Sequence, residues 1–154
     1  MAVLISQELK EVLEASKLCF FATVDEDGSP NLSPKASLKV WDNQHLIFAN
    51  IASPRSVSNL ANRPDVCINV VDFFKRKGFK INGMASVYKQ GTEEYEEVSN
   101  SFWETNGKSY PIPSVVKIRV TEISPVISPA YTYGEDLDEE VITKTFHKVY
   151  TNHE

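Results

Sequence analysis

The residues best suited to chemistry lie in one short stretch, residues 50–60, directly after an apolar run that predicts a strand. Ser53 and Pro54 are typical of a helix start, because proline is tolerated in the first turn and serine can cap free amides. Arg55 and Ser56 then fall where those amides point outward. A planar arginine fork, hydroxyl groups and free amides together suit a phosphate group. The stretch alone leaves an alternative open, a capped surface helix with a solvated arginine.

The cysteines and histidines form no metal-binding pattern. Cys19 and Cys67 each lie within an apolar run, which predicts buried, inert thiols. The sequence holds two cysteines and three histidines, and their spacing matches no zinc motif. His45 and His147 have no evident catalytic partner, so we interpret both as structural. No side chain stands out as a general acid or base.

Length and composition predict a single domain, residues 1–154, with a real hydrophobic core. The net charge of -5 and the isoelectric point near 5.3 argue against a general nucleic-acid binder. The longest apolar runs are far shorter than a membrane span, and residues 1–5 lack the basic start and apolar core of a signal peptide. We therefore expect a cytoplasmic protein that binds neither nucleic acid nor membrane.

Apolar periodicity predicts a mainly β protein with a few helices packed outside an antiparallel barrel. Pro34 interrupts the second strand and indicates an edge position or a bulge, and Gly83 indicates a bulge or a close backbone approach in the fifth. The Pro- and Tyr-rich segment 124–134 is typical of a loop. Six strands are expected, at residues 18–24, 31–40, 45–49, 66–71, 79–88 and 114–123, with helices at 6–16, after 53, at 93–106 and at 139–150.

Five segments, in their order and spacing, resemble the pyridoxamine 5′-phosphate oxidase-like family of FMN-binding split-barrel proteins. The segments are F-A-T-V-D-E-D-G-S-P-N-L-S-P-K at residues 21–35, L-I-F-A-N at 46–50, S-P-R-S-V-S-N-L at 53–60, N-R-P-D-V at 62–66 and F-K-I-N-G-M-A-S-V at 79–87. Residues after Gly107 match less distinctly. The resemblance implies a six-stranded antiparallel split β-barrel of Greek-key type. It also implies a homodimer that binds FMN in a groove at the dimer interface.

The same resemblance assigns residues to the FMN phosphate. Ser53, Arg55 and Ser56 would meet the phosphate at the helix start. Lys35, on the interrupted second strand, would lie beside the phosphate or the ribityl chain. The chemistry agrees, because a partly buried phosphate needs several donors, and one arginine, one lysine, hydroxyls and free amides supply them.

The resemblance also assigns residues to the rest of the cofactor. Ala49 and Asn50, at the end of the third predicted strand, would line the flavin ring. Asn59 would shape the loop more than it touches the ligand. Trp103 would reach over from the second subunit.

Three functions remain open at this point. The first is an oxidoreductase that acts through FMN on a small-molecule substrate or an electron partner. The second is a flavin carrier or electron-transfer protein without turnover. The third is a groove for another cofactor, since related split barrels take a deazaflavin or haem. The residues that the resemblance assigns to the FMN phosphate favour the first two functions.

A true pyridoxamine phosphate oxidase is not expected. Such oxidases carry a Trp- and Arg-containing segment near their end, which helps to bind the phosphorylated pyridine substrate. Residues after Ile123 hold no Trp and no Arg here, and Lys144 and Lys148 are their only cations at neutral pH. A second phosphate would therefore lack charged hydrogen-bond donors.

Overall fold

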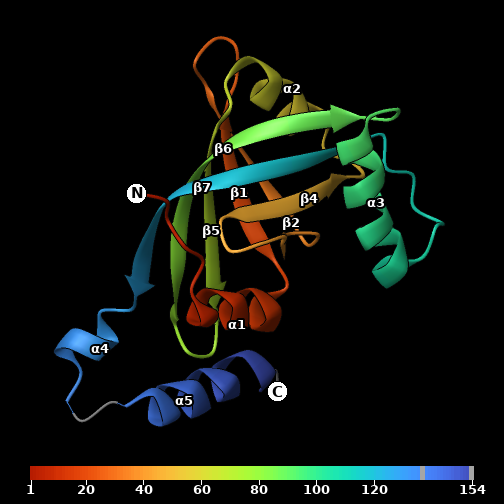
Figure 1. The fold of residues 1–154 in the computed structure, drawn as a ribbon. Coiled ribbons are helices and arrows are strands. Elements are labelled where there is room, and N and C mark those ends of the chain that lie inside the picture. Colours follow the sequence, from red (N-terminus) through yellow and green to blue (C-terminus); the bar gives the residue numbers. More distant parts are fainter. Residues whose placement is uncertain (136–137, 153–154) are drawn as a thin grey trace.

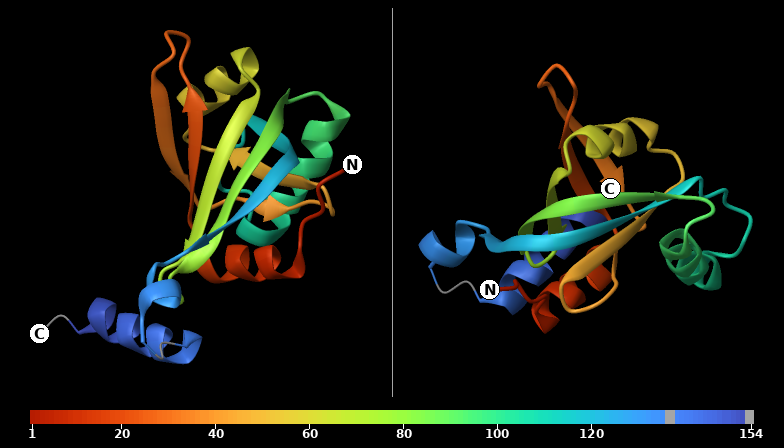
Figure 2. Two further views of the ribbon diagram at one scale, coloured as in Figure 1. Left: turned by 90° about the vertical axis from the view of Figure 1, so that its left-hand side faces the viewer. Right: turned by 45° about the horizontal axis from the view of Figure 1, so that its top comes forward.

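The computed structural model describes residues 1–135 and 138–152, which form one antiparallel sheet of seven strands (Figure 1). The strand order is β2-β1-β5-β6-β7-β4-β3. The edge strands β2 and β3 lie at opposite ends of this order although they are consecutive in the chain, so the curved sheet is a barrel with one open seam (Figure 2). The predicted fold class, an antiparallel split barrel with peripheral helices, is confirmed. The strands are β1 (Cys19–Val24), β2 (Pro30–Lys35), β3 (Lys39–Val40), β4 (His45–Asn50), β5 (Asp65–Asp72), β6 (Lys77–Lys89) and β7 (Ser114–Ile127).

The strand count differs from the prediction because residues 31–40 form two strands instead of one. β2 pairs with β1, whereas β3 pairs with β4 on the other side of the open seam. One continuous strand could not reach both partners, and the chain crosses the seam at residues 36–38. Pro34 lies inside β2, opposite Phe20, where an edge strand tolerates it.

The helices lie around the barrel and at its ends (Figure 1). Their bounds are α1 (Gln7–Ser16), α2 (Pro54–Asn62), α3 (Glu93–Asn106), α4 (Ala130–Tyr133) and α5 (Glu139–Thr151). The segment 124–134 is not all loop as predicted, because β7 continues to Ile127 and α4 follows it. α5 extends beyond the barrel (Figure 2). It contacts the β5–β6 turn, where the ring centroids of His147 and Phe74 lie 4.6 Å apart in a stacked arrangement. Among the described residues, no helix is long and apolar enough to cross a membrane.

Two clusters of buried side chains hold these elements together. The larger cluster fills the barrel, where the rings of Phe21 and Phe48 meet edge to face at 4.9 Å. The smaller cluster packs α3 against β4 and β7 and includes Ala49 and Phe102. Gly83 marks the expected bulge in β6, and a Cβ atom there would lie 2.5 Å from Cγ2 of Ile118. The second cluster matters most for function, because it fixes α3 beside the end of β4.

Candidate anion-binding site

Lys35, at the end of β2, is a buried cation without an acidic partner. Its side chain is 5% exposed, and Nζ donates hydrogen bonds to Oγ of Ser33, at 2.6 Å, and to Oγ of Ser53. Among the described residues, no carboxylate lies within ion-pair distance of this ammonium group. Burial lowers the pKa of Lys35. Two neutral hydroxyls and the Phe48 ring, whose centroid is 5.8 Å from Nζ, compensate a buried positive charge only in part, so the group is suited to an anion.

The start of α2 adds backbone donors beside this lysine. The Ser53 hydroxyl does not cap the helix, contrary to the prediction, because it accepts from Lys35 instead. Asn50 holds the helix entry through its side chain, since Oδ1 accepts from the Ser53 amide at 3.0 Å and Nδ2 donates to Ser114 at 3.0 Å. In the described part of the chain, the amides of Arg55 and Ser56 have no hydrogen-bond partner. The free amides and the helix dipole both favour an anion.

Arg55 forms an ion pair that the sequence did not indicate. Its Nε donates to Oδ1 of Asp25 at 3.0 Å, and Nη2 donates to Oδ2 of the same carboxylate. Asn59 donates to Oδ1 of Asp25 at 2.7 Å, and these hydrogen bonds, that from Arg55 first, hold the pKa of Asp25 below its ordinary value. Ser56 is 2% exposed and accepts a 3.4 Å hydrogen bond from Asn31 on β2. The side chains of Arg55 and Ser56 therefore both contact the β1–β2 hairpin.

Ala49 and Trp103 line one cavity of about 220 Å³ within the same chain. None of its lining residues is charged, and most are apolar or aromatic. Trp103 is half-buried, and its Nε1 is a buried donor that has no hydrogen-bond partner among the described residues. Asn50 does not line this cavity. The lining residues are Ala36, Ser37, Ala49, Ile51, Phe102, Trp103, Asn106, Gly107, Tyr110 and Ile112.

The cavity and the Lys35 site are neighbours along two chain segments. In the first segment, Lys35 of the site is followed by Ala36 and Ser37, which line the cavity. In the second segment, Ser53 of the site follows Ala49, which also lines the cavity. The Ser37 hydroxyl donates to the carbonyl of Ala49 at 3.3 Å and so ties the two segments together. A cationic, hydroxyl-rich site and an uncharged cavity are therefore formed by adjoining segments, an arrangement that would suit an elongated ligand with one anionic end and one flat apolar end.

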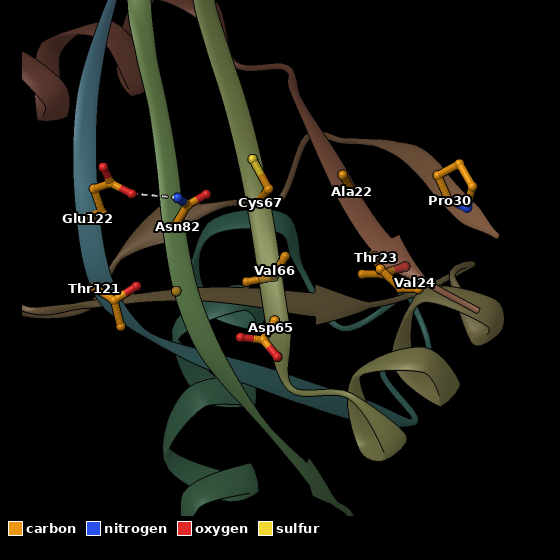
Figure 3. Close-up of a pocket in the computed structure, with 11 residues that line it drawn as sticks. Ala22, Thr23, Val24, Pro30, Asp65, Val66, Cys67, Asn82, Thr121 and Glu122 are labelled. Carbon is orange, nitrogen blue, oxygen red and sulfur yellow. Dashed lines mark hydrogen bonds between the residues drawn. The ribbon is translucent and has the colours of Figure 1, made fainter. Parts of the chain in front are cut away.

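A larger, shallow groove of about 650 Å³ crosses the sheet over β1, β5, β6 and β7 (Figure 3). Asn82 donates to Glu122 at 2.7 Å on its floor. Cys67 is half-buried there, so its predicted full burial is wrong, whereas Cys19 is buried. None of the residues expected to bind a cofactor lines this groove.

The open barrel with outer helices defines a split-barrel protein. The chain belongs to the pyridoxamine 5′-phosphate oxidase family, whose model matches residues 5–152. An uncharacterized protein of Methanocaldococcus jannaschii is 25% identical over 123 residues, which are 79% of this chain and 80% of that relative.

Solved structures share the fold. HupZ of Group A Streptococcus matches with a TM-score of 0.70 and 26% identity, over 80% of this chain and 95% of that one. An FMN-binding protein of Syntrophomonas wolfei matches with a TM-score of 0.66 and 17% identity, over 79% and 86% of the two chains. HutZ, the heme storage protein of Vibrio cholerae, matches with a TM-score of 0.61 and 21% identity, over 82% and 95%. The matches at 17% and 21% identity show a common fold, and they do not show which ligand this chain binds.

Proposed function

We propose that this protein binds FMN and acts as a flavin-dependent oxidoreductase on a small-molecule substrate or redox partner. The observation that carries the proposal is the buried Lys35 ammonium, whose partners are two neutral hydroxyls. A phosphate monoester, with a charge of about -1.5 to -2 at neutral pH, would supply the missing counter-charge. Membership of the family and a fold shared with an FMN-binding protein support this choice of ligand.

The residues present fit FMN at both ends. Lys35 and Ser53, with the amides of Arg55 and Ser56, would hold the phosphate. The cavity beside Ala49 would take the flat ring against the apolar and aromatic side chains that line it. Bound FMN supplies hydride or electron transfer, while the chain binds it, orients it and keeps water from the ring.

Binding is tested by titrating the protein with FMN and with riboflavin, which lacks the phosphate, while flavin fluorescence is followed. The proposal expects FMN to bind at least about tenfold more tightly, because one charged hydrogen bond contributes roughly 1.5–3 kcal/mol. Equal affinities for FMN and riboflavin would mean that the phosphate does not bind at Lys35. Turnover is tested separately, by reduction of the FMN-loaded protein with NADH or NADPH and reoxidation by oxygen or a quinone. Tight FMN binding without turnover would favour the flavin carrier.

A deazaflavin and haem are the alternative cofactors, and HutZ, a heme storage protein, shares the fold. The histidines that the structure describes do not favour haem. His45 contacts the carboxylate of Asp42 at 2.8 Å, and His147 stacks on Phe74. Neither lines the cavity. The absorption spectrum of the purified protein distinguishes the three cofactors directly.

A homodimer is part of the proposal, with the second copy covering the outer face of β1 and β2. Leu32 is 67% exposed and Phe20 is 37% exposed on these strands, which leaves apolar surface in need of a partner. The shallow groove in Figure 3 lies beside them. Leu32→Asp should convert the dimer into a monomer in light scattering, whereas Val149→Asp on α5, also exposed, should leave it intact. A wild type that is monomeric and still binds FMN would contradict the proposed dimer and leave the proposed FMN binding standing.

The cytoplasm is the proposed compartment. Cys19 and Cys67 are both free, which suits reducing surroundings. Burial raises the pKa of the Cys19 thiol to about 12, so this thiol is inert. Detection of the protein in the soluble cytoplasmic fraction of its cells would support the assignment, and recovery outside that fraction would contradict it.

A further inference from the structure

We propose that Asp25 is a positioning residue of the phosphate site, which acts by holding the guanidinium of Arg55. The inference rests on the proposed FMN function and concerns the same site. It names a residue at the first position of the β1–β2 turn, whose own contacts are with protein groups.

The carboxylate of Asp25 is the fixed part of this arrangement. Its side chain is 13% exposed, and Asn59 donates to it at 2.7 Å from the buried side of α2. The backbone amide of Asp25 donates to the Ser29 carbonyl at 2.8 Å, which closes the turn. Arg55, by contrast, has a side chain that is 69% exposed. The aspartate therefore decides where the arginine lies, and not the reverse.

Arg55 meets Asp25 along one edge of its planar fork, through Nε and Nη2. Nη1 has no hydrogen-bond partner among the described residues, so the edge formed by Nη1 and Nη2 is still available. A guanidinium can bind one oxyanion along each edge. An arginine fixed in this way loses less side-chain freedom when it meets a phosphate, and that lowers the entropic cost of binding.

Asp25 also removes positive charge from the site, which would by itself weaken the binding of an anion. That effect is small, because Arg55 is exposed and its charge is screened by water. The uncompensated charge of the site belongs to the buried Lys35, which Asp25 does not contact. Orientation of Arg55 therefore outweighs the lost charge.

The test compares FMN and riboflavin affinities for the wild type, Asp25→Asn, Arg55→Ala and the double variant, each measured by flavin fluorescence on protein shown to be folded by circular dichroism. Asp25→Asn should weaken FMN binding about tenfold, equivalent to roughly 1.4 kcal/mol, and leave riboflavin unchanged. In the Arg55→Ala background the same change should have no further effect, because Asp25 acts through Arg55. A purely structural aspartate would instead lower both affinities in both backgrounds.

Two further variants keep the proposal falsifiable. Glu26→Gln removes a neighbouring exposed carboxylate that makes no contact with Arg55, and it should leave both affinities unchanged. Arg55→Lys retains the charge at an exposed position but not the two-edged fork, so it should lower the preference for FMN over riboflavin about tenfold even if Asp25→Asn does not fold.

Tighter FMN binding by Asp25→Asn would overturn the proposal and make Asp25 a competitor of the phosphate. An unchanged preference in Arg55→Lys would overturn it as well. FMN binding that depends on Lys35 and not on Asp25 would overturn this inference and leave the proposed function standing. A wild type that binds no flavin would overturn both.

Discussion

Replacing Lys35 by methionine should separate the stability of the empty protein from its affinity for FMN. Methionine has a similar length and carries no charge, and the side chain it replaces is 5% exposed. Removing a buried charge in favour of an apolar group is often neutral or stabilising, so the free energy of unfolding should be unchanged or higher by up to about 1 kcal/mol. The FMN dissociation constant should rise roughly 10- to 150-fold, the equivalent of one charged hydrogen bond of about 1.5–3 kcal/mol.

The pH dependence gives this variant a second signature. Burial lowers the pKa of Lys35, so the folded empty protein gives up this proton at a lower pH than the unfolded chain does. Between the two pKa values the unfolded state binds more protons, and the stability of the empty wild type therefore rises with pH. FMN affinity should move the other way, because the phosphate needs the ammonium form. Lys35→Met should lose both trends.

Urea denaturation and FMN titration, each from neutral to alkaline pH, measure these quantities. Lys117→Met is the control, since Lys117 is also partly buried, lies over the Trp41 ring at 5.8 Å, and neither lines the cavity nor contacts Lys35. The control should keep the affinity and its pH dependence. The reasoning would be refuted by a Lys35→Met protein that binds FMN within about threefold of the wild type, or that loses more than about 2 kcal/mol of stability.

Three further outcomes are expected. Arg55→Ala should destabilise the empty protein at neutral pH, and the loss should shrink in acid as the pH falls through the lowered pKa of Asp25, which urea denaturation at both pH values would detect. Gly83→Ala should lower the free energy of unfolding by about 1–3 kcal/mol, because the new Cβ atom overlaps Ile118, and a neutral result would contradict the close approach. Trp103→Phe should weaken FMN and riboflavin equally, since it shrinks one aromatic side chain that lines the cavity, and a change in their affinity ratio would count against a ring site there.

Features encoded by neighbouring residues could be predicted from the sequence. α3 has the predicted bounds because the Thr92 hydroxyl accepts from the Tyr95 amide at 3.2 Å and Gly107, with φ of 77°, ends the helix. The edge position of Pro34 and the bulge at Gly83 follow in the same way, from what one residue type allows in a strand. Family resemblance added the split-barrel architecture, which local patterns do not contain.

Partners that are distant in the sequence could not be predicted. The Ser53 hydroxyl was expected to cap a helix, but Lys35, 18 residues earlier, binds it. Arg55 was expected to meet a phosphate or solvent, and nothing in the sequence indicated its ion pair with Asp25, 30 residues earlier. Asp25 begins the segment D-E-D-G-S-P, in which an aspartate is typical of a turn, so its sequence position did not indicate that its carboxylate binds Arg55. The division of residues 31–40 between β2 and β3 likewise depends on which strand each half meets across the seam.

The free edge of β2 limits how copies of this protein can associate. The Asp25 amide donates to the Ser29 carbonyl, and this bond sets the alternation along the hairpin. The backbone groups of β2 that bond to β1 are therefore those of Asn31, Ser33 and Lys35. The three residues that alternate with them direct their backbone groups outward. Two of those three intervening positions are Pro30 and Pro34, which have no N–H group. Leu32 alone offers an outward N–H group along this edge. A second copy therefore cannot extend the sheet by adding a strand here, and the exposed edge is protected from the open-ended strand stacking that leads to fibrils.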